Sequence, residues 1–380
     1  MALTQVDQGM LGTNAQYTGF KNRIYNGQMQ IDQRNAGASV TPINNQYTLD
    51  RWAGSTTQSS KFTIQQNAGS VTPPAGFTNY LGVTSSSAYS VVSTDYFGVM
   101  QLIEGYNVAD LAYNTASAQP VTLSFWVRAS IAGTYSAGLF NSVSGNRSFM
   151  KPYTVSASNT WQYVSITIPG DTAASVASTT NGTGLYAYFS IGAGSTFTMS
   201  GSSWTTGVYL AYTGQTSVVG TNGATFYITG VQLEKGSTAT SFDYRPYGTE
   251  LFLCQRYYAE IPSVSGASTG VGRITGTVNS TSGNPIVGNL YLPVPMRAAP
   301  GVTAYGGGKS GSGSISTYSG GSGGQVTYNT NVSGLSVPFI SANMFALNLA
   351  SIGSTQSGYS TWTDMGWASS QLAFVASAEL

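Results

Sequence analysis

Hydrophobic and polar residues alternate with a period of two along several short stretches of this chain, which is the pattern of half-buried β-strands. The clearest stretches span residues 121–128 and 161–168, and further strands are expected at 185–191 and 226–233. Clusters of Gly, Ser, Thr and Asn separate these stretches and supply the turns between them. Short strands with regular turn signals predict an all-β fold built as a sandwich.

Helical periodicity is almost absent, with one exception at residues 249–257. There Thr249 can cap a helix and Glu250 lies in the first turn, so the sequence predicts a short helix. Pro246 and Gly248 come directly before it. We therefore expect a junction between two domains at this position, with the helix linking them.

A length of 380 residues is more than one hydrophobic core usually serves, which also favours two domains. We expect residues 1–20 to form a polar N-terminal docking arm, 21–247 a first sandwich domain and 248–380 a second, C-terminal β-sandwich domain. Within the second domain, residues 306–324 are strongly biased toward Gly and Ser. That composition predicts an exposed loop.

Charged residues make up only 7% of the chain and the formal net charge is +1, whereas charged residues are about 25% of an average protein. No run of Lys or Arg interleaves with aromatic residues, so we expect no nucleic acid partner. No apolar run is long enough to insert into a membrane, and no secretory segment is visible. Cys254 is the one cysteine, which excludes an internal disulfide and fits assembly in a reducing cytoplasm.

The chain contains no histidine, which excludes the usual serine and cysteine triads and histidine acid–base catalysis. A pair of carboxylates could still hydrolyse a glycosidic bond, and Glu104 and Asp110 are a possible pair by their positions. Acids this scarce more often hold loops through arginine partners, so we expect no enzyme. No calcium-binding DxDxDG-type loop is visible, and neither a metal nor a cofactor is expected.

Several segments form a recurrent set. These are residues 22–34 with sequence NRIYNGQMQIDQR, 47–52 with YTLDRW, 231–236 with VQLEKG, 250–258, and 294–300 with VPMRAAP. In this order they resemble the opening, the closing strand and the joint to the C-terminal domain in tail fibre and virion surface proteins of bacteriophages. The resemblance implies a jelly-roll domain like that of carbohydrate-binding modules.

The charged residues of the first two segments are expected to stabilise the fold. They are Asp32, Arg34, Asp50 and Arg51. We place Asp32 and Arg34 in an opening strand near Asp50 and Arg51, where buried or half-buried opposite charges would pair. Because one unpaired member would cost several kcal/mol, we expect these residues to hold the domain together rather than bind a ligand.

The resemblance implies a phage virion protein, and three functions fit it. The first is a tail fibre or receptor-binding protein that contacts host surface polysaccharide, and the second is a head fibre or capsid decoration protein. A carboxylate-dependent polysaccharide depolymerase is the third. We expect a homotrimer on the virion surface, joined to other virion proteins through residues 1–20.

Ligand-binding residues are expected in the C-terminal domain, because docking at the N-terminus leaves this domain outermost. Aromatic residues that border or interrupt its polar, glycine-containing segments are the candidates, since Tyr and Trp stack on sugar faces at small entropy cost. They are Tyr305, Tyr318, Tyr328, Tyr359, Trp362 and Trp367. The alternative for Trp362 and Trp367 is an ordinary place in the core.

Overall fold

The computed structural model describes residues 20–261, 276–277, 287–306, 314–319, 328–331, 335–341, 344–349, 363–366 and 372–380. Contacts between backbone positions divide the chain into two compact units, Met1–Glu250 with Leu380, and Leu251–Glu379. Of the expected docking arm, residues 1–19 lie outside the described residues.

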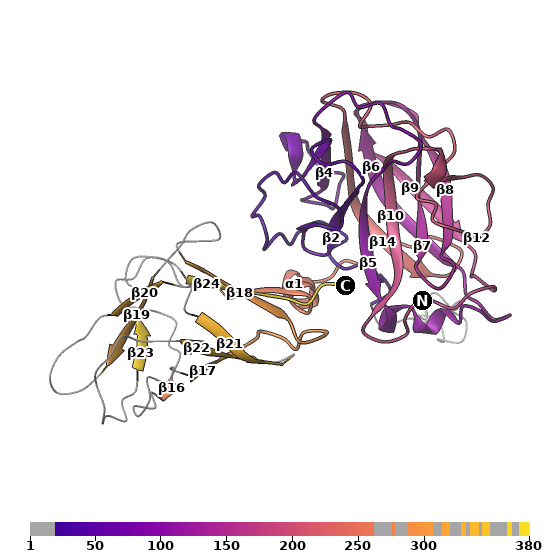
Figure 1. The fold of residues 1–380 in the computed structure, drawn as a ribbon. Helices are drawn as coiled ribbons and strands as arrows, with labels where there is room; N and C mark the ends of the chain where they lie inside the picture. The colour runs from indigo at the N-terminus through magenta and orange to yellow at the C-terminus, as the bar shows by residue number, and fades with distance from the viewer. Residues whose placement is uncertain are drawn as a thin grey trace, which may run out of the picture. The chain divides into compact units, whose positions relative to one another are not determined.

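Two large antiparallel sheets form most of the first unit (Figure 1), and β11 (Thr198–Met199) and β13 (Ala211–Tyr212) add a short parallel pair. The seven-stranded sheet has the order β1 (Tyr47–Leu49), β2 (Trp52–Thr56), β5 (Tyr96–Glu104), β10 (Thr183–Ala193), β7 (Gly133–Asn141), β8 (Arg147–Val155) and β12 (Thr205–Thr206). The five-stranded sheet has the order β3 (Phe62–Gln66), β4 (Leu81–Ser85), β14 (Thr225–Lys235), β6 (Val121–Ala129) and β9 (Gln162–Ile168). Since the chain passes back and forth between the sheets, the unit is a jelly-roll β-sandwich.

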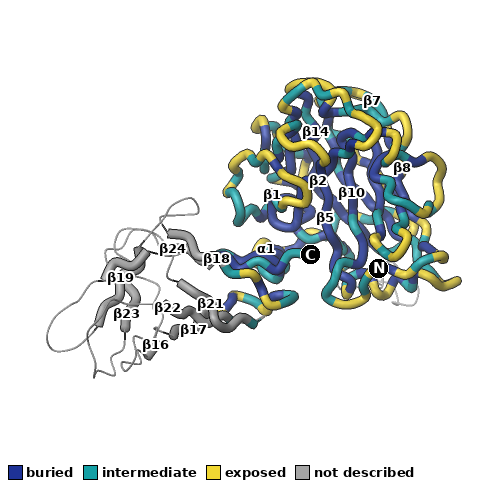
Figure 2. Tube along the Cα trace, in the orientation of Figure 1, coloured by how far each residue is buried: buried dark blue, intermediate teal, exposed yellow. Residues whose placement is uncertain are grey.

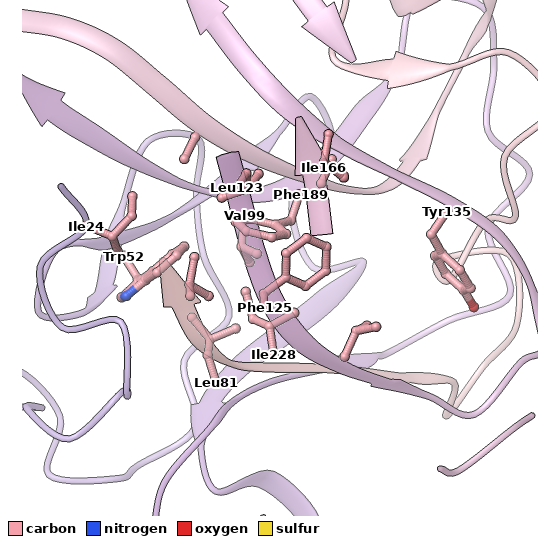
Figure 3. Packing of buried hydrophobic residues seen from close by; sticks show 14 of the residues in the cluster. Ile24, Trp52, Leu81, Val99, Leu123, Phe125, Tyr135, Ile166, Phe189 and Ile228 are labelled. Atoms are coloured by element: carbon pink, nitrogen blue, oxygen red, sulfur yellow. The ribbon is translucent and has the colours of Figure 1, made fainter. Parts of the chain in front are cut away.

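The inner faces of both sheets contribute to one hydrophobic core (Figure 3). Phe125 of β6 and Phe189 of β10 meet there edge to face, with ring centroids 5.0 Å apart. Trp52 of β2 packs on the other side of Phe189, at 5.9 Å. Burial follows the strands and exposure follows the connecting turns (Figure 2). The all-β prediction is confirmed, and all four predicted strands are present as β6, β9, β10 and β14.

The opening segment, residues 22–34, contains turns and bends but no strand, so the expected opening strand is wrong. Asn26 has a left-handed backbone conformation, φ 53°, and its side chain holds this segment together. Its side-chain amide donates to the carbonyl oxygens of Ile31 and Asp50 at 2.8 and 2.9 Å, and its Oδ1 accepts the Ile31 N–H at 3.0 Å. These bonds replace the ladder that a strand would make.

The four charged residues of the opening segments contact backbone groups and an aromatic ring of the first unit, which fits the expected structural role. The Asp50 carboxylate accepts the Gln33 N–H at 2.7 Å, and Asp32 accepts the N–H groups of Asn35 and Gly37. Arg51 is 1% exposed and donates to the Leu102 carbonyl oxygen at 2.6 Å. The Arg34 guanidinium lies over the Tyr47 ring, 5.2 Å from its centroid.

The predicted helix is present as α1 (Tyr247–Gln255). The described strands of the second unit form three antiparallel sheets, whose members follow. The first has the order β15 (Tyr258–Ile261), β24 (Leu372–Ser377) and β18 (Gly301–Gly306). The second has the order β16 (Gly276–Thr277), β17 (Val287–Tyr291), β22 (Met344–Leu349) and β21 (Leu335–Ile340). The third has the order β20 (Tyr328–Asn331), β19 (Ser314–Ser319) and β23 (Thr363–Gly366). No helix within the described ranges is long and apolar enough to cross a membrane.

The expectation of one exposed loop over residues 306–324 is wrong for its middle part. Ser314–Ser319 is a strand that pairs with both β20 and β23. Its sequence, SISTYS, inserts an Ile, a Thr and a Tyr into the Gly/Ser-rich stretch, and these residue types favour strands. Composition averaged over the whole stretch hides this local alternation.

Candidate functional site

The outer face of the seven-stranded sheet is largely covered by the chain itself. Residues 195–216 cross it, and their polar groups bind serines of the strands beneath. The Ser148 hydroxyl donates to the Gly207 carbonyl oxygen at 2.9 Å, the Tyr212 N–H donates to the Ser136 hydroxyl at 3.0 Å, and the Gln215 amide donates to the Ser190 hydroxyl at 2.7 Å. This face therefore offers little free sheet surface over β7, β8 and β10.

The outer face of the five-stranded sheet presents aromatic side chains. Because Phe125 and Val127 of β6 and Val164 of β9 belong to the core, the alternate residues Trp126 and Tyr163 point away from it. Tyr163 is 46% exposed. Among the large hydrophobic side chains on the described strands of these two sheets, only that of Tyr163 is exposed.

Trp126 and Tyr163 lie directly opposite each other on neighbouring strands, β6 and β9. Their ring centroids are 5.5 Å apart and their planes are inclined by 58°. The half-buried Trp126 and the exposed Tyr163 are thus neighbouring rings that are inclined to each other. We call Trp126, Tyr163, Arg128, Tyr227 and Trp161 together the Trp126 platform.

Arg128 follows Trp126 by two residues and so lies on the same face of β6. Its guanidinium carbon lies 5.5 Å from the centroid of the Tyr227 ring, and its Nε donates to the Asn159 carbonyl oxygen at 3.0 Å. Tyr227 is itself fixed, because it is 4% exposed and packs on Tyr80 at 5.0 Å. The arginine is therefore held in place by a ring and a carbonyl group.

Trp161 stands just before β9 and borders the platform. Its indole N–H donates to the Thr72 carbonyl oxygen at 2.9 Å, and its ring packs edge-on against Tyr80 at 5.6 Å. Trp161 is half-buried. The bond to Thr72 joins the edge of the sheet to the loop before β4 and so restricts the movement of this ring.

The acids that could have formed a hydrolytic pair have structural partners. Glu104 ends β5 and is 2% exposed. Asp110 makes ion pairs with Arg23 at 2.6 Å and Lys235 at 3.4 Å. Burial raises the pKa of Asp110, but the hydrogen bonds and charges of Arg23 and Lys235 outweigh it and hold that pKa below its ordinary value. A general acid for glycoside hydrolysis needs a raised pKa, so Asp110 is poorly suited to that role.

No group of three or more His, Cys, Asp or Glu side chains among the described residues is placed to hold a metal ion. Elsewhere in the unit, acids have specific partners. The Arg147 guanidinium binds Asp171 through two hydrogen bonds of 2.6 and 2.7 Å. Arg245 and Glu250 form a buried ion pair at 3.3 Å.

The structure places three of the predicted ligand-binding residues on strands of the second unit. Tyr305 lies in β18 and pairs with Ala373 of β24. Tyr318 lies in β19, and Tyr328 lies opposite Thr317 on the neighbouring strand β20. Tyr318 and Tyr328 thus share one sheet, whereas Tyr305 belongs to another. Tyr359, Trp362 and Trp367 lie outside the described residues, and a role for all six stays a prediction.

The Trp126 platform is not among the binding sites predicted above, although the sequence carries a signal for it. Trp126 occupies a polar position of the alternating pattern, between Ser124 and Arg128. A tryptophan at an outward-facing position has no core to fill. Tyr163 stands at an equivalent position of the next predicted strand, between the inward residues Gln162 and Val164 and beside Trp161.

Comparison with known proteins finds no matching family model and no matching curated protein. Among solved structures, the chain is similar to the enzymatically active domain of bacteriophage CBA120 tailspike protein 4, at 12% identity and a TM-score of 0.32 over 56% of this chain and 21% of that one. It is also similar to a family 11 carbohydrate-binding module from Clostridium thermocellum in complex with a mixed-linked tetrasaccharide, at 9% identity and a TM-score of 0.29 over 52% of this chain and 97% of that one.

A third similar structure is a xylan-binding domain from Paenibacillus barcinonensis, at 10% identity and a TM-score of 0.28, with 54% of this chain and 99% of that chain covered. The chain spans only about a fifth of the tailspike structure, 21% of its length. At these identities and TM-scores, the ligands of those proteins say nothing about the ligand of this chain.

Proposed function

We propose that this protein is a polysaccharide-binding protein on the surface of a bacteriophage particle, most simply a tail fibre or receptor-binding protein, and that the Trp126 platform contacts the polysaccharide. The observation that carries the glycan-binding proposal is the exposed Tyr163 inclined against Trp126 on the outer side of strands β6 and β9. The C-terminal aromatic residues predicted from the sequence are the rival location.

A sugar ring fits this surface for two reasons. Its faces are made of C–H groups, which pack against the electron-rich faces of Trp and Tyr. Its hydroxyl groups need hydrogen-bond partners, and Ser165 stands exposed on the same face of β9, two residues after Tyr163. Two inclined rings on rigid strands position a ligand without a large loss of conformational entropy.

The proposal is binding without catalysis. The chain lacks histidine, and both candidate carboxylates, Glu104 and Asp110, are taken up by burial or by ion pairs. A protein that binds a polysaccharide at an open sheet face also lacks the enclosing walls that exclude water from a reacting bond. Release of reducing sugar ends from a bound polymer would contradict this part of the proposal.

Replacing Tyr163 or Trp126 by Ala is expected to weaken polysaccharide binding by about tenfold each, which corresponds to about 1.4 kcal/mol. The reason is the loss of one stacking face in each variant. Affinity electrophoresis through gels that contain single neutral or acidic polysaccharides measures this effect. The fold should be kept, because both side chains point away from the core.

Tyr106→Ala is the matched control, because Tyr106 is 61% exposed on the η3 turn, Gly105–Asn107, away from the platform strands. We expect this variant to bind as the unchanged protein does. If all three variants migrate alike in a gel whose polysaccharide retards the unchanged protein, the binding site is not the Trp126 platform.

The resemblance of residues 22–34 and 47–52 to phage tail fibre and virion surface proteins supports a place on the surface of a phage particle. Gold-labelled antibodies against the protein are expected to mark the tails of purified particles in electron micrographs. Label on the heads alone would favour a capsid decoration protein instead. The homotrimer and docking through residues 1–20 stay predictions.

A further inference from the structure

We infer that the polysaccharide bound at the Trp126 platform is acidic, and that Arg128 binds a carboxylate group of the sugar that stacks on Trp126 and Tyr163. This inference rests on the proposed function and names the class of its ligand. It starts from the state of the Arg128 side chain, which differs from that of Arg23, Arg147 and Arg245.

Three other arginines of the first unit have specific acid partners. Arg23, Arg147 and Arg245 each make an ion pair with a carboxylate, Asp110, Asp171 and Glu250 respectively. Within the described residues, Arg128 has no carboxylate at ion-pair distance, and its one hydrogen bond is from Nε to the Asn159 carbonyl oxygen. Its two terminal nitrogens donate to no described group and reach solvent.

Glu234 and Asp243 do not pair with Arg128. Glu234 stands opposite Thr122, six residues along β6 from Arg128, and both acids have other partners. Glu234 of β14 accepts hydrogen bonds from the Thr240 N–H and hydroxyl at 2.8 and 2.7 Å. Asp243 accepts the N–H groups of Lys21 and Asn22 at 3.0 and 3.1 Å. In a chain with only 7% charged residues, a free guanidinium on a sheet face is an uncommon feature.

The Arg128 side chain is also held in a position from which it can bind a planar anion. Tyr227 supports one face of the guanidinium and Asn159 binds its Nε, so the fork of terminal nitrogens is ordered before a ligand arrives. A guanidinium fork matches the two oxygens of a carboxylate and binds it through two charge-assisted hydrogen bonds. An ordered fork loses little entropy on binding.

The distance from the rings suits a carboxylate that belongs to the stacked sugar itself. Residues two apart on one face of a strand are separated by about 6–7 Å along the chain, and Arg128 follows Trp126 at that spacing. A uronic acid carries its carboxylate directly on the carbon next to the ring oxygen. When such a ring stacks on Trp126 and Tyr163, its carboxylate can point along β6 toward Arg128.

The test compares polyuronates with their carboxyl-reduced forms, in which the carboxylate is replaced by a hydroxymethyl group. Alginate, polygalacturonate and hyaluronan serve as probes in affinity gels, together with a sulfated polymer, carrageenan. We expect the unchanged protein to bind at least one polyuronate about tenfold more tightly than its reduced form. Binding should weaken between about 0.1 and 1 M salt, because salt screens an exposed charge pair.

Arg128→Gln is expected to bind the polyuronate and its reduced form equally, while Arg128→Lys keeps a smaller preference because it keeps the charge but not the fork. Lys151→Gln is the matched control, since it removes an exposed positive charge from β8 of the other sheet. It should keep the full preference. Thermal unfolding of Arg128→Gln checks that the fold persists, and the salt dependence of the unchanged protein gives a readout without any substitution.

Equal binding of the acidic and reduced polymers by the unchanged protein, with both weakened in Trp126→Ala, would overturn the acidic ligand and leave the proposed function standing. An equal loss in Lys151→Gln and Arg128→Gln would overturn the specific role of Arg128. Tighter binding of carrageenan than of any polyuronate would replace the carboxylate by a sulfate. Failure to bind any polymer would contradict the proposed function and this inference together.

Discussion

Replacing Asn26 by Leu is expected to lower the free energy of unfolding of the first unit by about 3–6 kcal/mol. Leu has the same number of side-chain heavy atoms but leaves the N–H and C=O of Ile31 and the C=O of Asp50 without the partners they have now. Each buried, unsatisfied backbone group costs about 1–3 kcal/mol. Asn26 is 0% exposed, so water cannot replace the lost bonds.

Asn45→Leu is the matched control for backbone strain. Asn45 has a similar left-handed conformation, φ 64°, but its side chain is exposed. We expect a loss of about 1 kcal/mol there, from the backbone conformation alone. Urea unfolding followed by tryptophan fluorescence measures both variants, since Trp52 donates its indole N–H to the Asn26 carbonyl oxygen at 3.1 Å. Equal losses in the two variants would mean that the side-chain hydrogen bonds of Asn26 contribute little.

Strands β6 and β9 are predictable because hydrophobic and polar residues alternate along their sequences. Leu123, Phe125 and Val127 are each 0% exposed, and their polar neighbours face outward. The conformation of residues 22–34 is not predictable in this way, because side chains of Asn26 and Asp32 bind the local backbone and leave no periodic pattern. The sequence does indicate that these residues stabilise the domain, since they hold several of its few charges.

The candidate site can be predicted from the sequence only in part. The alternating pattern already places Trp126 and Arg128 on one face of a strand, but strand pairing decides what stands beside them. Only the register of β6 against β9 and β14 brings Tyr163 opposite Trp126 and Tyr227 opposite Arg128. Nor does any periodic signal in residues 195–216 indicate that they cover the other sheet. Met199 and Leu210 join a small hydrophobic cluster with Met150 there, and single hydrogen bonds such as the one from Ser148 to Gly207 add to it.

The central claim is that polysaccharide binding resides on the Trp126 platform of the first unit. Two double variants of the full chain separate it from the rival location in the second unit. Trp126→Ala with Tyr163→Ala removes both stacking faces of the platform. Tyr305→Ala with Tyr318→Ala removes two of the aromatic residues that the sequence analysis favoured.

Isothermal titration calorimetry with the polysaccharide that retards the unchanged protein most strongly is the decisive measurement. We expect the platform variant to lose about 100-fold in affinity, which corresponds to about 2.7 kcal/mol, while the Tyr305 and Tyr318 variant binds as the unchanged protein does. The reverse result, with full affinity in the platform variant and loss in the other, would contradict the account and place recognition in the second unit.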